Sequence, residues 1–281
     1  MAFSIQKTLH KGIKMKLGPS FDFVDFRDLP NPTDASGAAS MRDRLHEKGL
    51  LVIDSFPLDD ELLMSFSRQF GAPDLVYPPE YRAPNYSHIR IQSTLPGVGV
   101  SGGGEYWHSD GPWSQPPSAV TILLCFESSF GSGQTLFVDM RAVFDGLPEH
   151  FQRDLAQCMG SYPCRAIYER ELGYLGIADQ EKLSELRDLT HPIVRPHPVT
   201  GRKALYLNEK WLESIEGMSP DESQHLLTEL YNISSTNDSL YSHHWRTGDL
   251  LVWDNASMMH KALPTESGAV KTTHRVTIAG I

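Results

Sequence analysis

The sequence predicts a mainly β protein with peripheral helices, built on a double-stranded β-helix (jelly-roll, cupin-like) core. Short apolar segments of strand length recur along the chain, and turn residues are plentiful, with 22 Gly and 19 Pro. The few segments with a helical pattern do not alternate regularly with the strands, as they would in a doubly wound parallel sheet. Many short strands joined by turns instead favour two packed sheets.

Two helices with a strand between them are expected near the N-terminus. The first helix covers about residues 37–48, the strand is LLVIDSF at 50–56, and the second helix lies within FPLDDELLMSFSRQFG at 56–71. The paired acids of that stretch suit a helix N-terminus, and Gly71 ends the helix. Residues 72–106 are rich in Pro, Tyr and Gly, so we expect loops over a working face there, with one strand around 88–92.

Strands become dense after residue 118. The expected elements are strands at 119–128, 134–139, 204–208, 248–255 and 274–281, a GSG turn at 131–133, and a helix at 148–159. The clearest helix is 219–234, in which Ser219 is a good N-cap and Pro220 suits the first helical position. Three leucines of this segment fall on one helical face, which predicts a helix packed on the core.

Composition limits the classes of function. No internal repeat or linker divides the 281 residues, so one domain over residues 1–281 is the simplest expectation. With 25 basic and 35 acidic residues the formal charge is −10, which argues against nucleic acid as a partner. The N-terminus lacks the apolar core of a secretory signal, the apolar stretches are too short to span a membrane, and three cysteines form no C-x-x-C pair. These features predict a cytoplasmic protein with neither nucleic acid nor a membrane as partner, and they do not decide whether it forms a homo-oligomer.

One short stretch, WHSDGPW at 107–113, points to a metal site. His108 and Asp110 are suitable ligands for first-row divalent metals, although such a triplet is expected by chance roughly once in a chain of this composition. His260 follows the apolar strand LLVWDN and is expected in a loop or strand end at the rim of a sheet. Two histidines and one carboxylate with three open positions form the ligand set of non-haem Fe(II) oxygenases.

Five ordered blocks make the chain similar to a known family. They are WHSDGPW (107–113), GSGQTLFVDM (131–140), THPIVRPHPVTGRKALYLN (190–208), WRTGDLLVWDNASMMHKA (245–262) and HRVTI (274–278). In this order they resemble the taurine and 2,4-dichlorophenoxyacetate dioxygenase (TauD/TfdA) family of Fe(II)/2-oxoglutarate-dependent enzymes. The resemblance runs from about residue 100 to the C-terminus, and the two N-terminal helices fit it as well.

The resemblance implies roles for particular residues. His108, Asp110 and His260 would be the metal ligands and hold Fe(II), which 2-oxoglutarate would chelate while one position stays open for O2. Thr135 matches the threonine that binds the distal carboxylate of 2-oxoglutarate. By its spacing Lys271 stands where the family has the arginine for that carboxylate, and Arg275 stands where a second arginine lies beside the iron. Lys lacks the bidentate fork of Arg, and we expect both residues to take part in binding the distal carboxylate. Arg275 ranks first and Lys271 second, because the HRVTI segment around Arg275 matches the family better.

The implied activity is oxidation, most simply hydroxylation, of a small anionic or amino-acid-derived substrate, with decarboxylation of 2-oxoglutarate to succinate and CO2. Asp110 argues against halogenation, since related halogenases lack this carboxylate, but it leaves open desaturation, cyclisation or oxidative rearrangement. Two rivals from other classes remain open at this point. One is a zinc-type hydrolase with the same three ligands, and the other is a jelly-roll binding protein without catalytic activity.

We predict that Arg275→Ala strongly lowers turnover, because it removes a guanidinium from the cosubstrate or substrate region of the site. The measurement is succinate release at ordinary cosubstrate concentrations. Near-normal turnover of this variant would contradict the assignment of Arg275.

Overall fold

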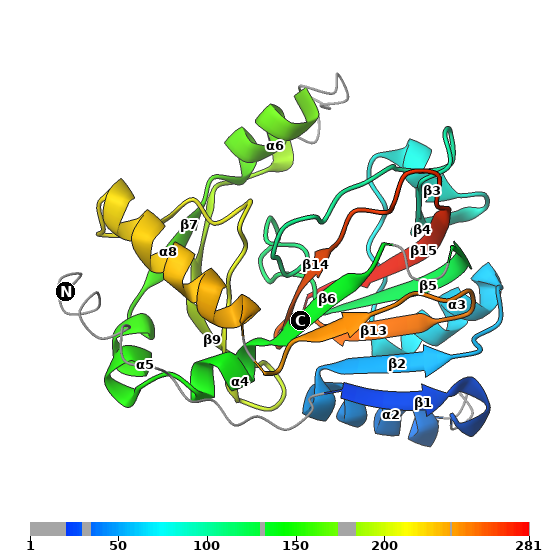
Figure 1. Ribbon diagram of the computed structural model, residues 1–281, viewed down its shortest axis with the longest axis horizontal. Coiled ribbons are helices and arrows are strands. Elements are labelled where there is room, and N and C mark those ends of the chain that lie inside the picture. The colour runs from blue at the N-terminus through cyan, green and yellow to red at the C-terminus, as the bar shows by residue number, and fades with distance from the viewer. Residues whose placement is uncertain (1–20, 30–34, 130–132, 174–183, 237, 281) are drawn as a thin grey trace.

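Two facing β-sheets form the centre of the computed structural model (Figure 1), which describes residues 21–29, 35–129, 133–173, 184–236 and 238–280. The larger sheet has the strand order β1 (Phe21–Asp25), β2 (Leu50–Asp54), β13 (Leu250–Asp254), β5 (Val120–Ser128), β15 (Lys271–Ile278), β4 (Tyr86–Ser93) and β3 (Arg82–Ala83). The smaller sheet has the order β12 (Tyr241–His243), β6 (Thr135–Asp139) and β14 (Met258–Ala262). In both sheets neighbouring strands are antiparallel, except for the parallel pair β1 and β2.

Residues that alternate along the central strands pack on opposite faces of the larger sheet. On the inner face Leu50, Leu123 and Trp253 pack against Phe137 of β6 and Met258 of β14. The intervening residues of β2, β5 and β13 belong to a separate core on the outer face. Because both faces are covered, these strands are almost continuously apolar in the sequence instead of alternating with polar residues.

Two helices cover the outer face of the larger sheet. Leu45 of α2 (Ala35–Lys48) and Phe66 of α3 (Asp60–Ser67) pack in the same core as the outward side chains of the strands. The Asp59 carboxylate begins α3 by accepting the backbone N–H groups of the second and third helical residues. The predicted N-terminal order of helix, strand and helix is confirmed.

A third core lies beside the two sheets and contains the remaining helices (Figure 1). These are α4 (Met140–Asp145), α5 (Glu149–Leu155), α6 (Cys164–Gly173) and α8 (Pro220–Ser235), with the small sheets β11–β7–β8 (Ser214–Ile215, Met159–Tyr162, Leu189–Pro192) and β10–β9 (Lys203–Leu205, Val194–Pro196). As predicted, Ser219 caps α8, and it does so in a capping box with Glu222. The described residues also form short 3-10 helices at Phe26–Asp28, Arg68–Phe70 and Pro79–Tyr81.

Several elements differ from the sequence prediction. The helix expected at 148–159 ends at Leu155, because Met159 already belongs to β7, and the strand expected at 204–208 is reduced to β10. Elements β1, β7, β8, β9, β11, β12, β14, α4 and α6 were not predicted, since a segment of a few residues shows too little periodicity. The last strand starts at Lys271, three residues before the predicted start. Residues 131–132 of the expected GSG turn lie outside the described residues.

The position of His260 also differs from the prediction. It is the middle residue of β14, not part of a loop or strand end, and it is buried. A tight turn follows β13, in which the Ser257 N–H donates to the carbonyl of Asp254 (3.1 Å). The turn carries the chain from the larger sheet to the smaller one, so His260 faces the space between the sheets.

The predicted fold class, mainly β with peripheral helices and a double-stranded β-helix core, is confirmed by this arrangement. The expectation of one domain over residues 1–281 stays a prediction. Among the described helices, none combines the length and the apolar character needed to cross a bilayer.

We predict that Leu45→Ala lowers the free energy of unfolding by about 2–5 kcal/mol, because Leu45 is fully buried between α2 and the larger sheet. Urea unfolding followed by circular dichroism measures the change. Leu58→Ala is the matched control, since Leu58 is 47% exposed, and its effect should stay within about 0.5 kcal/mol. Equal effects of the two substitutions would contradict this description of the core.

Candidate metal centre and its cavity

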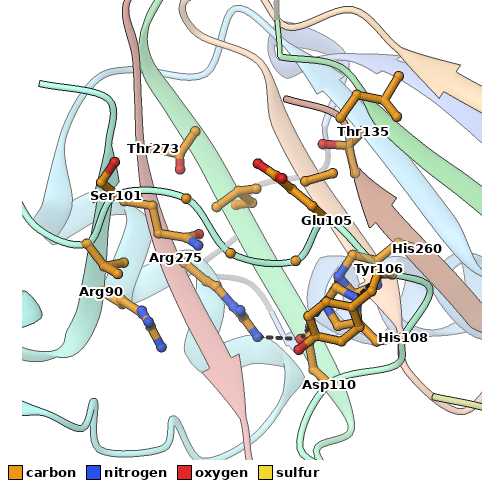
Figure 2. A pocket seen from close by; sticks show the side chains of 18 of the residues that line it. Arg90, Ser101, Glu105, Tyr106, His108, Asp110, Thr135, His260, Thr273 and Arg275 are labelled. Carbon is orange, nitrogen blue, oxygen red and sulfur yellow. Dashed lines mark hydrogen bonds and ion pairs between the residues drawn. The ribbon is translucent and has the colours of Figure 1, made fainter. Parts of the chain in front are cut away.

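A cavity of about 410 Å³ opens between the two sheets, within the range typical of small-molecule sites. Strands β4, β5, β6, β14 and β15 contribute its walls, together with the loop segments 100–106 and 108–113. All six residues that the sequence analysis selected line it, namely His108, Asp110, Thr135, His260, Lys271 and Arg275. Figure 2 shows His108, Asp110, His260 and Arg275 gathered together, with Thr135 at a distance from them.

The two histidines are joined by their backbones. His108 donates its N–H to the carbonyl of His260 (2.9 Å), and His260 donates its N–H to the carbonyl of His108 (2.8 Å). This single antiparallel bridge attaches the loop to β14 and brings the ring centroids to 4.1 Å. The sequence separation of the two histidines is therefore closed by one local pairing.

Asp110 lies between the two imidazoles. Its Oδ1 is 3.8 Å from His108 Nε2, and its Oδ2 is 3.8 Å from His260 Nε2. Thr121 on β5 donates its hydroxyl to Oδ2 (2.7 Å), and Arg275 Nη2 on β15 is 2.7 Å from Oδ1. The carboxylate is thus oriented by groups from two neighbouring strands.

Asn255, directly after β13, holds the same region. Its side-chain oxygen accepts the N–H of Asp110 (3.2 Å), and its amide nitrogen donates to the Thr121 hydroxyl (3.0 Å). Asn208 donates to the carbonyl of Ser109 (3.1 Å), which fixes the loop from the other side. Sequence reasoning missed the roles of Thr121, Asn208 and Asn255; only the matched W-D-N and L-Y-x-N blocks gave a signal for the two asparagines.

The protonation of the three side chains suits metal ligands. Burial lowers the pKa of His108 and lowers that of His260 well below the ordinary value, so both imidazoles are neutral. Burial by itself would raise the pKa of the Asp110 carboxyl, but Arg275, followed by the two imidazoles and the Thr121 hydroxyl, holds it well below the usual range. His108 Nδ1–H donates to the carbonyl of Tyr106 (2.7 Å), which leaves the Nε2 lone pair directed at the site.

The donor set fits a divalent metal ion. One ligand atom from each of His108, Asp110 and His260 lies within 4.8 Å of the others, and all three side chains are buried. Two donors that are each about 2.1 Å from one ion are at most about 4.2 Å apart, so the two separations of 3.8 Å suit a shared ion. His260 Nε2 is the ring nitrogen that faces Asp110, and its Nδ1 is buried without a hydrogen-bond partner among the described residues.

A second polar group lies along the cavity, away from the histidines. Thr135 accepts the indole N–H of Trp245 at its hydroxyl oxygen (3.0 Å), and Lys271 Nζ lies over the Trp245 ring, 4.8 Å from its centroid. Lys271 Nζ also donates to the carbonyl of Gly133 (2.5 Å). Burial lowers the pKa of Lys271 to about 8. Thr135 and Lys271 therefore share one end of the cavity, whereas Arg275 lies at Asp110.

Another cluster of two histidines and one carboxylate, His46, His197 and Asp254, has a structural role instead. His46 Nδ1 and His197 Nε2 both contact the same carboxylate oxygen of Asp254, at 2.9 and 2.6 Å. His197 Nδ1 accepts the N–H groups of Val199 and Thr200, so its Nε2 carries the proton that is donated to Asp254. These hydrogen bonds connect α2, the segment at 197 and the end of β13.

We predict that Thr121→Val weakens binding of a divalent metal about tenfold, because it removes the hydroxyl that orients Asp110. Anaerobic calorimetric titration with Fe(II) measures the affinity. Thr277→Val is the control, since Thr277 is paired with Thr121 on β15 but, in the described part of the chain, its hydroxyl makes no hydrogen bond to Asp110. Equal affinities of the two variants would show that the hydroxyl does not support the ligand.

Comparison with known proteins places these observations in a family. The family model described as "Taurine catabolism dioxygenase TauD, TfdA family" matches residues 11–277. The chain is 27% identical to the alpha-ketoglutarate-dependent 2,4-dichlorophenoxyacetate dioxygenase of Burkholderia sp. (strain RASC), over 92% of this chain and 90% of that protein. It is 30% identical to pentalenolactone F synthase of Streptomyces arenae, over 71% of this chain and 72% of that protein.

Solved structures agree with the sequence comparison. The structure of AAD-2 in complex with Mn(II) and N-oxalylglycine matches with a TM-score of 0.77 and 25% identity, over 95% of this chain and 98% of that chain. A taurine dioxygenase from Burkholderia xenovorans has the same fold, with a TM-score of 0.76 over 95% of this chain and 90% of that chain, at 22% identity. Several matched relatives are named alpha-ketoglutarate-dependent dioxygenases, which argues against the hydrolase and the binding protein. The chain is therefore an enzyme of the TauD/TfdA family of alpha-ketoglutarate-dependent dioxygenases.

Proposed function

We propose that the protein uses Fe(II), 2-oxoglutarate and O2 to hydroxylate a small anionic or amino-acid-derived substrate in this cavity. The observation that carries the proposal is the presence of two histidines, a carboxylate and a Thr–Lys pair in one cavity. His108, Asp110 and His260 hold the metal. When bound, the iron and 2-oxoglutarate supply the oxidising chemistry with O2, and the cosubstrate is released as succinate and CO2.

The two cationic groups have separate tasks. Thr135 and Lys271 bind the distal carboxylate of 2-oxoglutarate, because they lie together beside Trp245. Arg275 stays with Asp110, where its guanidinium holds the ligand carboxylate ionised and in place. The geometry thus favours Lys271 over Arg275 for the distal carboxylate, the reverse of the order expected from the match to the family's sequence blocks.

The apolar wall of the cavity suits the body of an organic substrate. Trp113 and Trp211 lie with ring centroids 5.0 Å apart, and both line the cavity beside Pro112 and Leu123. Trp113 is 42% exposed, so part of the indole remains for contact with a ligand at the entrance. These rings exclude water from the metal end and orient the substrate.

The state of the cysteines indicates the cellular compartment. The three cysteines, Cys125, Cys158 and Cys164, are buried and unpaired, which fits a reducing compartment. We place the enzyme in the cytoplasm as a single domain that acts on a small molecule.

The first test is an anaerobic titration of apo-protein with Fe(II) and then with 2-oxoglutarate, followed by visible absorption. A weak charge-transfer band that requires both additions supports a chelated 2-oxo acid on the His–Asp–His iron. Iron binding without a band would mean that this chain, which has Lys271 where the family has an arginine, does not bind 2-oxoglutarate. Failure of Fe(II) to bind would contradict the proposed function.

The relative from Streptomyces arenae is named a synthase. A second possible outcome is therefore oxidation of the substrate without addition of a hydroxyl, which has to be distinguished from hydroxylation. Mass spectrometry of the product distinguishes the two. Gain of one oxygen atom supports hydroxylation, whereas loss of two hydrogens supports desaturation or ring closure.

We predict that the affinity for 2-oxoglutarate falls several-fold as pH rises through about 8, because Lys271 then loses its proton and its charge. Below that pH the ammonium is present and binding is strong. The neighbouring Cys125 thiol has a pKa raised to about 12 and stays neutral in this range. Calorimetric titrations on both sides of pH 8 measure the effect.

The control for this pH dependence is Lys271→Arg, whose guanidinium stays charged, so its affinity should remain flat. An identical pH dependence in both proteins would assign the titration to another group.

A further inference from the structure

A pair of arginines faces the cavity next to the metal end. Arg90 on β4 and Arg275 on β15 are directly opposite each other in the antiparallel pairing of these strands, and both line the cavity. Like charges in opposite positions of a sheet destabilise it. The larger sheet therefore retains an unfavourable pair of positive charges where its strands line the cavity.

The two guanidiniums have different partners. Arg275 is paired with Asp110 at 2.7 Å, whereas Arg90 makes no ion pair with any carboxylate of the described residues. The Nε of each arginine is buried without a hydrogen-bond partner in the described part of the chain, so the ion pair with Asp110 is what separates the two. The Arg90 guanidinium lies 5.4 Å from the centroid of the Tyr81 ring. In Figure 2 a dashed line joins Arg275 to Asp110, and none reaches Arg90.

Burying such a cation is unfavourable unless an anion compensates it. Burial and the charge of Arg275 lower the pKa of Arg90 to about 10, so the group still carries its proton at neutral pH. The acids that line the cavity are Asp110, which is already paired, and Glu105, which is exposed on the loop. Neither supplies the missing partner.

We propose that Arg90 is the residue that binds the anionic group of the substrate, a carboxylate or sulfonate, and so determines specificity for organic anions. This inference rests on the proposed function and assigns the substrate anion to Arg90 and not to Arg275. A planar guanidinium with a free Nε can bind both oxygens of such a group. Gln92, which follows on the same face of β4 and lines the cavity, offers a further donor.

The division of charges supports this assignment. Lys271 is placed at the Thr135 end for the cosubstrate, and Arg275 remains on the metal-ligand carboxylate. Arg90 is then the one cation of the described cavity lining that is left for a second anion. Two anionic molecules can thus enter the same cavity at different cationic groups.

The experiment compares an acid with its neutral analogue on protein loaded anaerobically with Fe(II) and 2-oxoglutarate. The probes are phenoxyacetate and benzenesulfonate as anions and phenoxyacetamide as the neutral analogue, with affinities measured by calorimetry. Wild-type protein should bind at least one of the anions about tenfold or more tightly than the amide. Arg90→Gln should lose that preference, while its weak affinity for phenoxyacetamide stays the same.

Two further variants serve as controls for the effect of Arg90→Gln. Arg82→Gln is the matched control, because Arg82 is the other cross-strand neighbour of Arg90, does not line the cavity, and donates to the carbonyl of Val76. It removes the same charge and should leave the anion preference intact. Arg90→Lys retains the charge without the fork, and it should keep only part of the preference; this variant serves as the test if Arg90→Gln does not melt cooperatively.

Equal anion binding by wild type, Arg90→Gln and Arg90→Lys would overturn the inference, as would a wild-type protein that prefers neither anion to the amide. The absorption band of the Fe(II)–2-oxoglutarate complex is recorded in every protein. A normal band with no effect of Arg90 rejects this inference alone, whereas absence of the band in wild type rejects the proposed function.

Discussion

The site depends on one backbone pairing, the antiparallel bridge between His108 and His260. Its two hydrogen bonds join a loop that has no regular structure of its own to a strand that is held in a sheet. These bonds fix the backbones of His108 and His260 relative to each other and so bring their side chains to the same place. Asp110 follows within the same loop and is placed by hydrogen bonds from Thr121 and Asn255.

The charges in the cavity are arranged around this centre. Asp110 is the buried anion, and burial of an anion is tolerated because Arg275 and a hydroxyl satisfy it. Lys271 at one end and Arg90 next to Arg275 carry the remaining positive charge. A formal charge of −10 for the chain does not prevent this local excess of cations, so net charge by itself is a poor guide to the ligand.

The residues at the end of β13 hold both the core of the protein and the loop of the candidate metal centre. Asp254 binds His46 of α2 and His197, whereas the next residue, Asn255, binds the ligand loop. Two adjacent polar residues at the end of an apolar strand thus face in different directions and fix different parts of the chain. Removing either would leave buried donors unsatisfied, which is more costly than the loss of one hydrogen bond.

The sequence by itself determined the fold class, the long central strands and the capped helix α8, and it selected His108, Asp110 and His260 as candidate metal ligands, because apolar runs, caps and motif spacing are local signals. It did not determine that His260 lies inside a strand, that Lys271 lies beside Thr135, or that Arg90 faces Arg275. Those facts depend on which strands are neighbours and in what register, and a one-residue change of register would turn each side chain to the opposite face. Only the tertiary structure fixes this pairing, since it results from the packing of all strands together.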